Sequence, residues 1–219
     1  IKVKLLDKNQ GISGATNEAA SLASGDYILL MDNDDELAHS ALHEFYQKIK
    51  KDGSEILYSD MDIIDAKGRT RDPLCKPDWS PDLFLSQMYL GHLVGFKKSL
   101  FDEVGGFRSE FNGSQDYDLL LRMTEKTDKI GHVAEILYHW RDLPSSTAAN
   151  PESKPYAQIA GLNAIQEHLN RVYGSGKAIA HETDNLFVYD VRYPMEEEPM
   201  VSICLLYTSP SPRDYAASR

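Results

Sequence analysis

The sequence predicts an α/β fold built on a doubly wound, mostly parallel mixed sheet flanked by helices. The first observation is that strand-length apolar runs alternate with helical stretches between residues 3 and 59. The second is the uninterrupted apolar run Tyr27–Met31, which is typical of a strand covered on both faces. The third is the acidic stretch "DNDD" directly after this run, because open α/β sheets bind ligands beyond the carboxyl ends of their strands.

The first part of the chain alternates regularly between expected strands and helices. Gly25 ends the first expected helix. Lys50 and Lys51 form a basic last turn in the second helix, which Gly53 stops. We expect strands at 3–6, 27–31 and 55–59, and helices at 13–23 and 41–52.

The later elements are spaced less regularly. Several prolines after residue 59 predict a loop-rich insertion on the ligand side of the sheet. Ser114 is the expected N-cap of a helix that carries Asp116 in its first turn, and Pro155 opens another helix. We expect further strands at 91–96, 133–138 and 186–191, and a short helix at 98–104.

Composition argues against several classes of function. A formal net charge of −11 over 219 residues argues against a nucleic-acid backbone as the main partner, which would need clustered Lys and Arg. No run approaches the roughly 18 apolar residues of a membrane span. Cys75 and Cys204 lie far apart and suggest neither a disulfide framework nor a zinc site. With no leader before Ile1, we expect a reducing compartment, the cytoplasm.

The acidic residues Asp32, Asp34 and Asp35 allow three interpretations. An isolated pattern of this kind is most often a solvated turn or a helix N-terminus. An EF-hand calcium loop would need Gly and Glu where this chain has Leu37 and His43, so that interpretation fails. The third is a divalent cation, magnesium or manganese, held by one or two carboxylates and by substrate phosphates.

Two later motifs carry further candidates. In "GSQDYD", the helix dipole and the first-turn amides should keep Asp116 ionised, and an anchored carboxylate can act as a general base. In "YHWR", a strand end could present His139 to a metal held by carboxylates. Taken alone, helix capping is the commoner role for such an Asp, and a satisfied polar contact is commoner for such a His.

Three blocks taken together resemble the inverting family 2 glycosyltransferases of the GT-A type, which have a Rossmann-like sheet. They are "GISGATNEAASLASGDYILLMDNDDEL", "GSQDYDLLLR" and "ILYHWR", in the order in which the family has them. The intervening stretch from "YSDMDIID" to "GGFR" resembles a bacterial subgroup that builds surface polysaccharides, often with two such domains in tandem. The resemblance runs from Ile1 to about Pro199.

The resemblance implies a role for each matching residue. Asp34 and Asp32 would hold Mn²⁺ or Mg²⁺ against the diphosphate of a nucleotide-sugar, Asp35 would support them, and His139 would complete the coordination. Asp116 would take the proton of an acceptor hydroxyl, on a glycan or lipid-linked acceptor, as that oxygen attacks the anomeric carbon and inverts it. The membrane's inner face is then the expected place of action.

Some positions depart from the family's pattern. Thr16 stands where Arg is frequent, which puts one phosphate contact in doubt, and Gln115 stands where an acidic residue is common. Asn17 and Lys8 are donor-side candidates, although Asn17 could equally make a local hydrogen bond in its helix.

We expect three parts along the chain. Residues 1–172 would form the catalytic domain without its first strand, 173–199 a C-terminal extension and linker, and 200–219 the start of a second domain. From Cys204 onward a Ser/Pro-rich tail looks non-native, and we expect it to be disordered. The alternatives to a glycosyltransferase are a nucleotidyltransferase, which leaves Asp116 and His139 unexplained, and a non-catalytic glycan-binding or scaffolding domain of a tandem protein.

Overall fold

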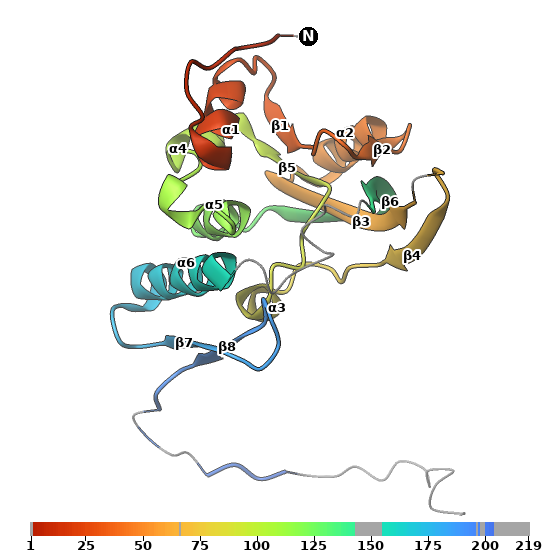
Figure 1. Cartoon of the computed structure of the whole chain (residues 1–219). Coiled ribbons are helices and arrows are strands. Elements are labelled where there is room, and N and C mark those ends of the chain that lie inside the picture. Colours follow the sequence, from red (N-terminus) through yellow and green to blue (C-terminus); the bar gives the residue numbers. More distant parts are fainter. Residues whose placement is uncertain (1, 66, 143–154, 196, 198–199, 204–219) are drawn as a thin grey trace, which may run out of the picture.

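The structure is a computed structural model that describes residues 2–65, 67–142, 155–195, 197 and 200–203. A mixed sheet lies at its centre, with helices on both faces (Figure 1). The strands of this sheet are β1 (Tyr27–Leu30), β2 (Glu36–Leu37), β3 (Ile56–Ile64), β4 (Thr70–Leu74), β5 (Val94–Lys97) and β6 (Ile130–Arg141). In the described part of the chain, no helix is long and apolar enough to cross a membrane.

The strand order is β1-β5-β3-β6-β2, and β4 pairs with β3 outside this row. β3 and β6 are parallel, and the pairs β1–β5, β3–β5, β2–β6 and β3–β4 are antiparallel. The strands β1, β3 and β6 therefore run in one direction. The predicted α/β mixed sheet is confirmed, but its pairings include more antiparallel ones than expected. One reason is the short loop between β3 and β4, since a parallel connection needs a crossover of about a dozen residues.

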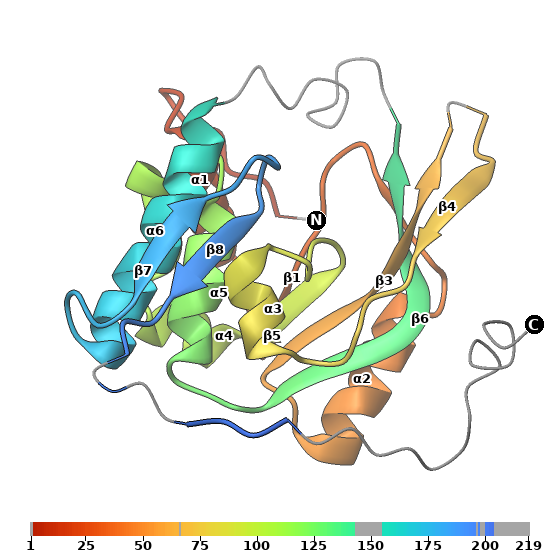
Figure 2. The ribbon, with the colours of Figure 1, turned by 90° about the horizontal axis from the view of Figure 1, so that it is seen from below.

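The helices cover the two faces unequally. Figure 2 shows α2 on one side of β3 and β6, and α4, α5 and α6 on the other. The helices are α1 (Gly11–Ser21), α2 (Ala41–Asp52), α3 (Pro81–Ser86), α4 (Lys98–Glu103), α5 (Gln115–Thr124) and α6 (Pro155–Tyr173). A hairpin of β7 (Ile179–Glu182) and β8 (Tyr189–Arg192) packs near α6 and α3.

Side-chain alternation along β3 builds the core on both faces. Ile56 and Tyr58 face the larger cluster, which includes residues of α4, α5 and α6. Leu57 and Met61 face the smaller cluster, in which Phe45 of α2 is buried. Because β3 is covered on both sides, its polar side chains must find partners inside the protein.

Most predicted elements are confirmed with shifted ends, and three expectations are corrected. The expected strand at 3–6 is wrong: Val3 and Leu5 are 77% and 91% exposed, and no neighbouring strand pairs with them in the described structure. The expected loop-rich insertion contains β4 and α3. Ser114 precedes α5 but does not cap it, because its hydroxyl donates to the carbonyl of Ala157 at 2.7 Å.

Other expectations were not tested. The tail from residue 204 lies outside the described residues. The division of the chain at 172 and 199 stays a prediction. The strand β7 was not predicted at all.

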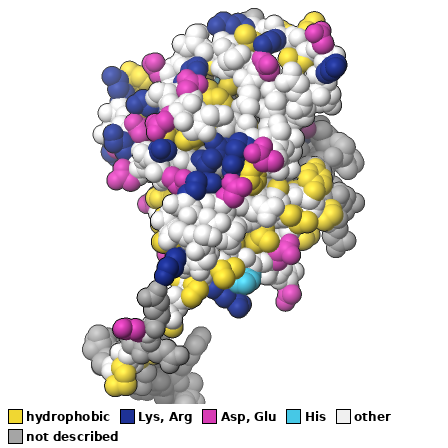
Figure 3. Space-filling view, turned by 90° about the vertical axis from the view of Figure 1, so that its left-hand side faces the viewer, with side chains coloured by type: hydrophobic (Ala, Val, Ile, Leu, Met, Phe, Trp, Pro, Cys, Tyr) yellow, Lys and Arg dark blue, Asp and Glu magenta, His cyan; other side chains and the backbone are white. Residues whose placement is uncertain are grey.

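The helical side of the molecule has a mixed surface. Figure 3 shows Lys and Arg side chains interspersed with Asp and Glu on this side. Such alternation fits a solvated face better than a polyanion-binding surface.

Candidate active site at the carboxyl edge of the sheet

The acidic turn follows β1 and is held against β6. The amide of Asp32 donates to the hydroxyl oxygen of Tyr138 at 3.2 Å. That hydroxyl in turn donates to the carboxylate of Asp35, whose other oxygen accepts from the amide of Arg141 at 2.8 Å. Asp35 is 7% exposed, so its carboxylate secures the turn from inside.

Asp32 and Asp34 lie on the outer side of the same turn. Both are exposed. Arg141 binds the backbone carbonyl of Asp34 through Nε at 2.7 Å, so the main chain is fixed while the carboxylate faces solvent. One carboxylate oxygen of Asp32 lies 3.6 Å from Nε2 of His92. Carboxylate oxygens are ligands that divalent cations prefer, so these two exposed side chains on a fixed backbone could serve a cation.

Asp116 at the start of α5 belongs to the same neighbourhood. Burial raises the pKa of its carboxyl, the charge on Asp32 raises it further, and His92 lowers it. Its carboxylate accepts a hydrogen bond from the amide of Tyr117 at 2.9 Å. From the sequence we expected the helix amides to dominate the pKa of Asp116, but burial dominates it instead. A raised pKa makes a carboxylate a stronger base once it is ionised.

His139 reaches the site through an irregularity in the sheet. The register between β3 and β6 shifts twice, between Ser59 and Met61, so that Asp62 pairs with His139. Nδ1 of His139 lies 2.6 Å from the buried Asp62 carboxylate. A carboxylate on one ring nitrogen is the usual support of a metal-binding histidine, since it orients Nε2. The antiparallel pair Glu36–His139 places the acidic turn beside it.

The remaining predicted site residues, Asn17 and Lys8, lie in α1 and just before it. Asn17 bridges to the backbone of Phe107, donating to its carbonyl at 2.8 Å and accepting from its amide at 2.9 Å. This bond spans 90 residues, so it is not local to the helix. Lys8 is exposed just before α1. Thr16 donates to the carbonyl of Ile12 at 2.8 Å within α1, and Gln115 accepts from the amide of Gly113 at 2.7 Å.

Sequence reasoning missed His92, Lys76 and the carboxylates of β3. Asp60 and Asp62 alternate along β3 in "YSDMDII", and acidic residues within an otherwise apolar strand are a signal of buried partners. Asp60 accepts from His132 at 2.8 Å. For His92 the sequence gives no signal, because its neighbours come from distant segments.

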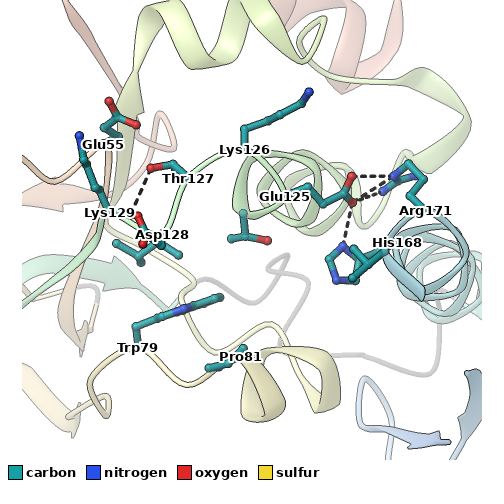
Figure 4. A pocket seen from close by; sticks show the side chains of 13 residues that line it. Glu55, Trp79, Pro81, Glu125, Lys126, Thr127, Asp128, Lys129, His168 and Arg171 are labelled. Carbon is teal, nitrogen blue, oxygen red and sulfur yellow. Dashed lines mark hydrogen bonds and ion pairs between the residues drawn. The ribbon is translucent and has the colours of Figure 1, made fainter. Parts of the chain in front are cut away.

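A separate hollow of about 900 Å³ lies at the opposite end of the sheet, near the starts of β3 and β6 (Figure 4). Three of its ionisable side chains pair with one another. Glu125 binds His168 at 2.8 Å and Arg171 at 2.7 Å. This hollow is therefore distinct from the carboxylate site.

The sequence of the chain is similar to those of known proteins. The model of Glycosyl transferase family 2 matches residues 1–105. Uncharacterized protein y4gI of Sinorhizobium fredii is 41% identical over 209 residues, which are 94% of this chain and 23% of that protein. The O-antigen biosynthesis protein RfbC of Myxococcus xanthus is 35% identical over 204 residues, which are 93% of this chain and 16% of that protein. The chain spans less than a quarter of either relative.

A solved structure shares the fold. TarS of S. aureus, residues 1–349, in complex with UDP-GlcNAc, matches with a TM-score of 0.56 at 17% identity, covering 78% of this chain and 55% of that one. At this identity the likeness shows the fold alone. The family and relative matches identify the chain as a member of glycosyltransferase family 2, and the solved structure shows that it has the GT-A fold.

Proposed function

We propose that this chain transfers a sugar, with inversion, from a nucleotide-sugar to a glycan or lipid-linked acceptor in bacterial surface-polysaccharide synthesis. The observation that carries the proposal is the proximity of Asp116 to Asp32, across His92, at the carboxyl edge of the sheet. The names of RfbC, an O-antigen biosynthesis protein, and of the TarS complex with UDP-GlcNAc support the substrate classes. Because the relatives are much longer, we also propose that a second transferase domain acts beside this one.

In the proposed reaction, Asp116 is the base. An acceptor hydroxyl oxygen forms a bond to the anomeric carbon while the bond from that carbon to the diphosphate oxygen breaks. The hydroxyl proton passes to a carboxylate oxygen of Asp116, and the nucleoside diphosphate leaves with the bonding electrons. Partial burial of Asp116 favours this proton transfer, because it makes the ionised carboxylate more basic.

A divalent cation, Mn²⁺ or Mg²⁺, fits the donor set near the acidic turn. Asp34 and Asp32 would supply exposed carboxylates, and His139 an imidazole oriented by Asp62. Within the described residues these three side chains do not form a ready-made group of three metal ligands, so the ion would need further ligands from substrate phosphates. When bound, the cation would neutralise charge on the leaving diphosphate.

The residues around the cation site have defined tasks of their own. Asp35 and Tyr138 hold the acidic turn in place. Arg141 fixes the backbone of Asp34. We propose that Lys8 faces the donor phosphates and that Asn17 keeps α1 and the segment before α5 together. Asn17 would then act on the donor only indirectly.

The test is donor turnover by the purified protein, with a panel of nucleotide-sugars and with or without Mn²⁺. We expect Asp116→Asn to abolish transfer while donor binding persists, and Asp34→Ala to remove the response to Mn²⁺. Asp102→Asn is the matched control, because Asp102 is an exposed carboxylate that pairs with Lys98 on α4. Equal turnover in wild type and Asp116→Asn would contradict the proposal. Donor binding without any transfer by wild type would favour the non-catalytic alternative.

A further inference from the structure

Lys76 lies beneath the segment that carries His92, and its ammonium binds backbone rather than a counterion. Nζ donates to the carbonyls of Leu90 and His92, each at 2.6 Å, and to the carbonyl of Ser59. An ammonium has three donors and no acceptor, so these bonds use all of them. The side chain thereby ties β3 to two successive carbonyls of the segment before β5.

Gly91, between these two carbonyls, lies directly over the ammonium. Its φ is +46°, a conformation that residues with a side chain rarely adopt. A Cβ at this position would be 3.9 Å from Nζ of Lys76 and 3.9 Å from the sulfur of Met61. The backbone is therefore bent around the charge, with carbonyls turned inward on both sides.

Lys76 is itself anchored to the sheet. Its amide donates to Asp60 at 2.9 Å, and Asp60 also accepts from the His132 ring at 2.8 Å. The side chains of Asp60 and His132 are 7% and 5% exposed. The His132 ring stacks on the Tyr58 ring, with the two ring centroids 4.8 Å apart. The backbone of Lys76 is thus held in place by Asp60 of β3 and, through Asp60, by His132 of β6.

The segment held by Lys76 presents His92 to the proposed reaction centre. The His92 ring stacks on Tyr138 with centroids 4.9 Å apart, and its Nε2 lies 3.6 Å from Asp32. Nδ1 of His92 is buried and makes no hydrogen bond within the described part of the chain. The His92 ring is held only by this stacking and by the 3.6 Å contact with Asp32. Its position therefore depends on where the backbone of His92 lies.

We infer that Lys76 is a positioning residue that sets His92 between Asp32 and Asp116. This inference rests on the proposed function. A buried charge is costly, and an apolar side chain could fill the same space without it. What the ammonium adds is direction, since three convergent bonds define where the backbone of residues 90–92 lies.

The test compares Lys76→Met with His92→Ala and with the double variant. If Lys76 acts through His92, we expect Lys76→Met to lower kcat at least tenfold in the wild-type background and less than threefold in His92→Ala. Lys76→Arg should not rescue, because the larger guanidinium does not fit under Gly91. Losses that multiply in the double variant would overturn the inference.

A matched control separates positioning from general stability. Arg122 is another largely buried cation that binds backbone, donating to the carbonyls of Val104 and Gly106 at 2.6 and 2.7 Å, and it also pairs with Asp118. Arg122→Met should destabilise the fold without a selective loss of kcat among folded molecules. If Lys76→Met and Arg122→Met lose activity only in proportion to unfolding, the inference is wrong.

Hydrogen exchange tests the inference independently of activity. Lys76→Met should speed amide exchange in residues 89–94 and leave the amides of α5 unchanged. Unchanged exchange in 89–94 would overturn the inference. If wild type shows no turnover with any donor, the proposed function fails, and this measurement alone decides the positioning role.

Discussion

Asp116 and Asp118 lie two residues apart on α5 and meet opposite surroundings. Asp118 is fully buried between two arginines: its carboxylate binds Arg108, and it binds Arg122 at 2.7 Å. Asp116 is only partly buried and has His92 and the acidic Asp32 as its charged neighbours. One helix turn thus carries one carboxylate whose charge is compensated inside the fold and one whose charge is not.

The same division separates Asp34 from Asp35 in the acidic turn. Asp35 is buried with both oxygens hydrogen-bonded, whereas Asp34 is exposed and only its backbone is held. Carboxylates satisfied by the fold stabilise it, and those left without internal partners are available to a ligand or a proton. We therefore expect Asp35 and Asp118 to act mainly in stability and Asp34 and Asp116 mainly in function, and variants can test that division.

Removing the compensated carboxylate should have the largest effect on stability. Asp118→Ala leaves Arg108 and Arg122 facing each other near a buried space. We expect a loss of about 3–5 kcal/mol in the free energy of unfolding, measured by urea denaturation. A loss below about 1 kcal/mol would show that solvent already screens the ion pairs of Asp118 with Arg108 and Arg122.

In contrast to Asp118→Ala, Asp116→Asn should cause a large loss of activity and no loss of stability. Removing a general base typically costs about 10²–10⁴-fold in rate. Burial raises the pKa of Asp116, so its contribution to stability is present at low pH and is lost as pH rises through the folded-state value. We therefore expect the Asn variant to be at least as stable as wild type at pH 7, with the difference vanishing in acid. A variant that is less stable at pH 7 would contradict this assignment.

Tyr138→Phe should have an intermediate effect. The variant leaves the buried Asp35 carboxylate without one donor and the Asp32 amide without its acceptor. The expected loss of stability is about 1–3 kcal/mol. Isothermal titration should show weaker binding of the nucleoside diphosphate, because the acidic turn loosens. Unchanged binding at reduced stability would mean that the turn is held mainly by Arg141.

The smallest effect should come from the titration of Lys76. Burial lowers its pKa to about 8, which the facing carboxylate of Asp60 opposes. A neutral amine has two donors, so one of its three carbonyl bonds is lost, and turnover should fall as pH rises through about 8. Because the unfolded chain binds this proton up to about pH 10.5, its contribution to stability rises with pH over the same range. If turnover and stability both fell as the pH rose through about 8, deprotonation of Lys76 would not be the cause of the fall in turnover.

Sequence patterns predicted the elements that carry local signals. The apolar run of β1, the helical spacing and Gly53 stop of α2, and the Asp116 helix all follow from neighbouring residues. The pattern at 3–6 failed because a strand also needs a paired neighbour, which sequence spacing does not reveal.

The candidate site was predictable only in part, for the same reason. Asp32, Asp34 and Asp116 could be predicted as candidates because they sit in short motifs at element ends. Arg108, which binds Asp118, is ten residues away from it in the sequence. The Asp62–His139 contact spans 77 residues. Lys76 and His92 have no motif at all, since their roles arise from contacts with backbone carbonyls and with distant rings.

The irregular pairing of β3 with β6 has a consequence for how such a site can change. Ser59 faces Val133, yet Asp62 faces His139, so β6 carries three more residues than β3 over this span. In a regular ladder Asp62 would face Ile136, and His139 would lie beyond it. The position of the imidazole is thus set by the number of residues in a bulge and not by the core beneath it. Because side chains alternate between the two faces of a strand, adding or deleting one residue there would turn His139 to the other face of β6 and away from Asp62.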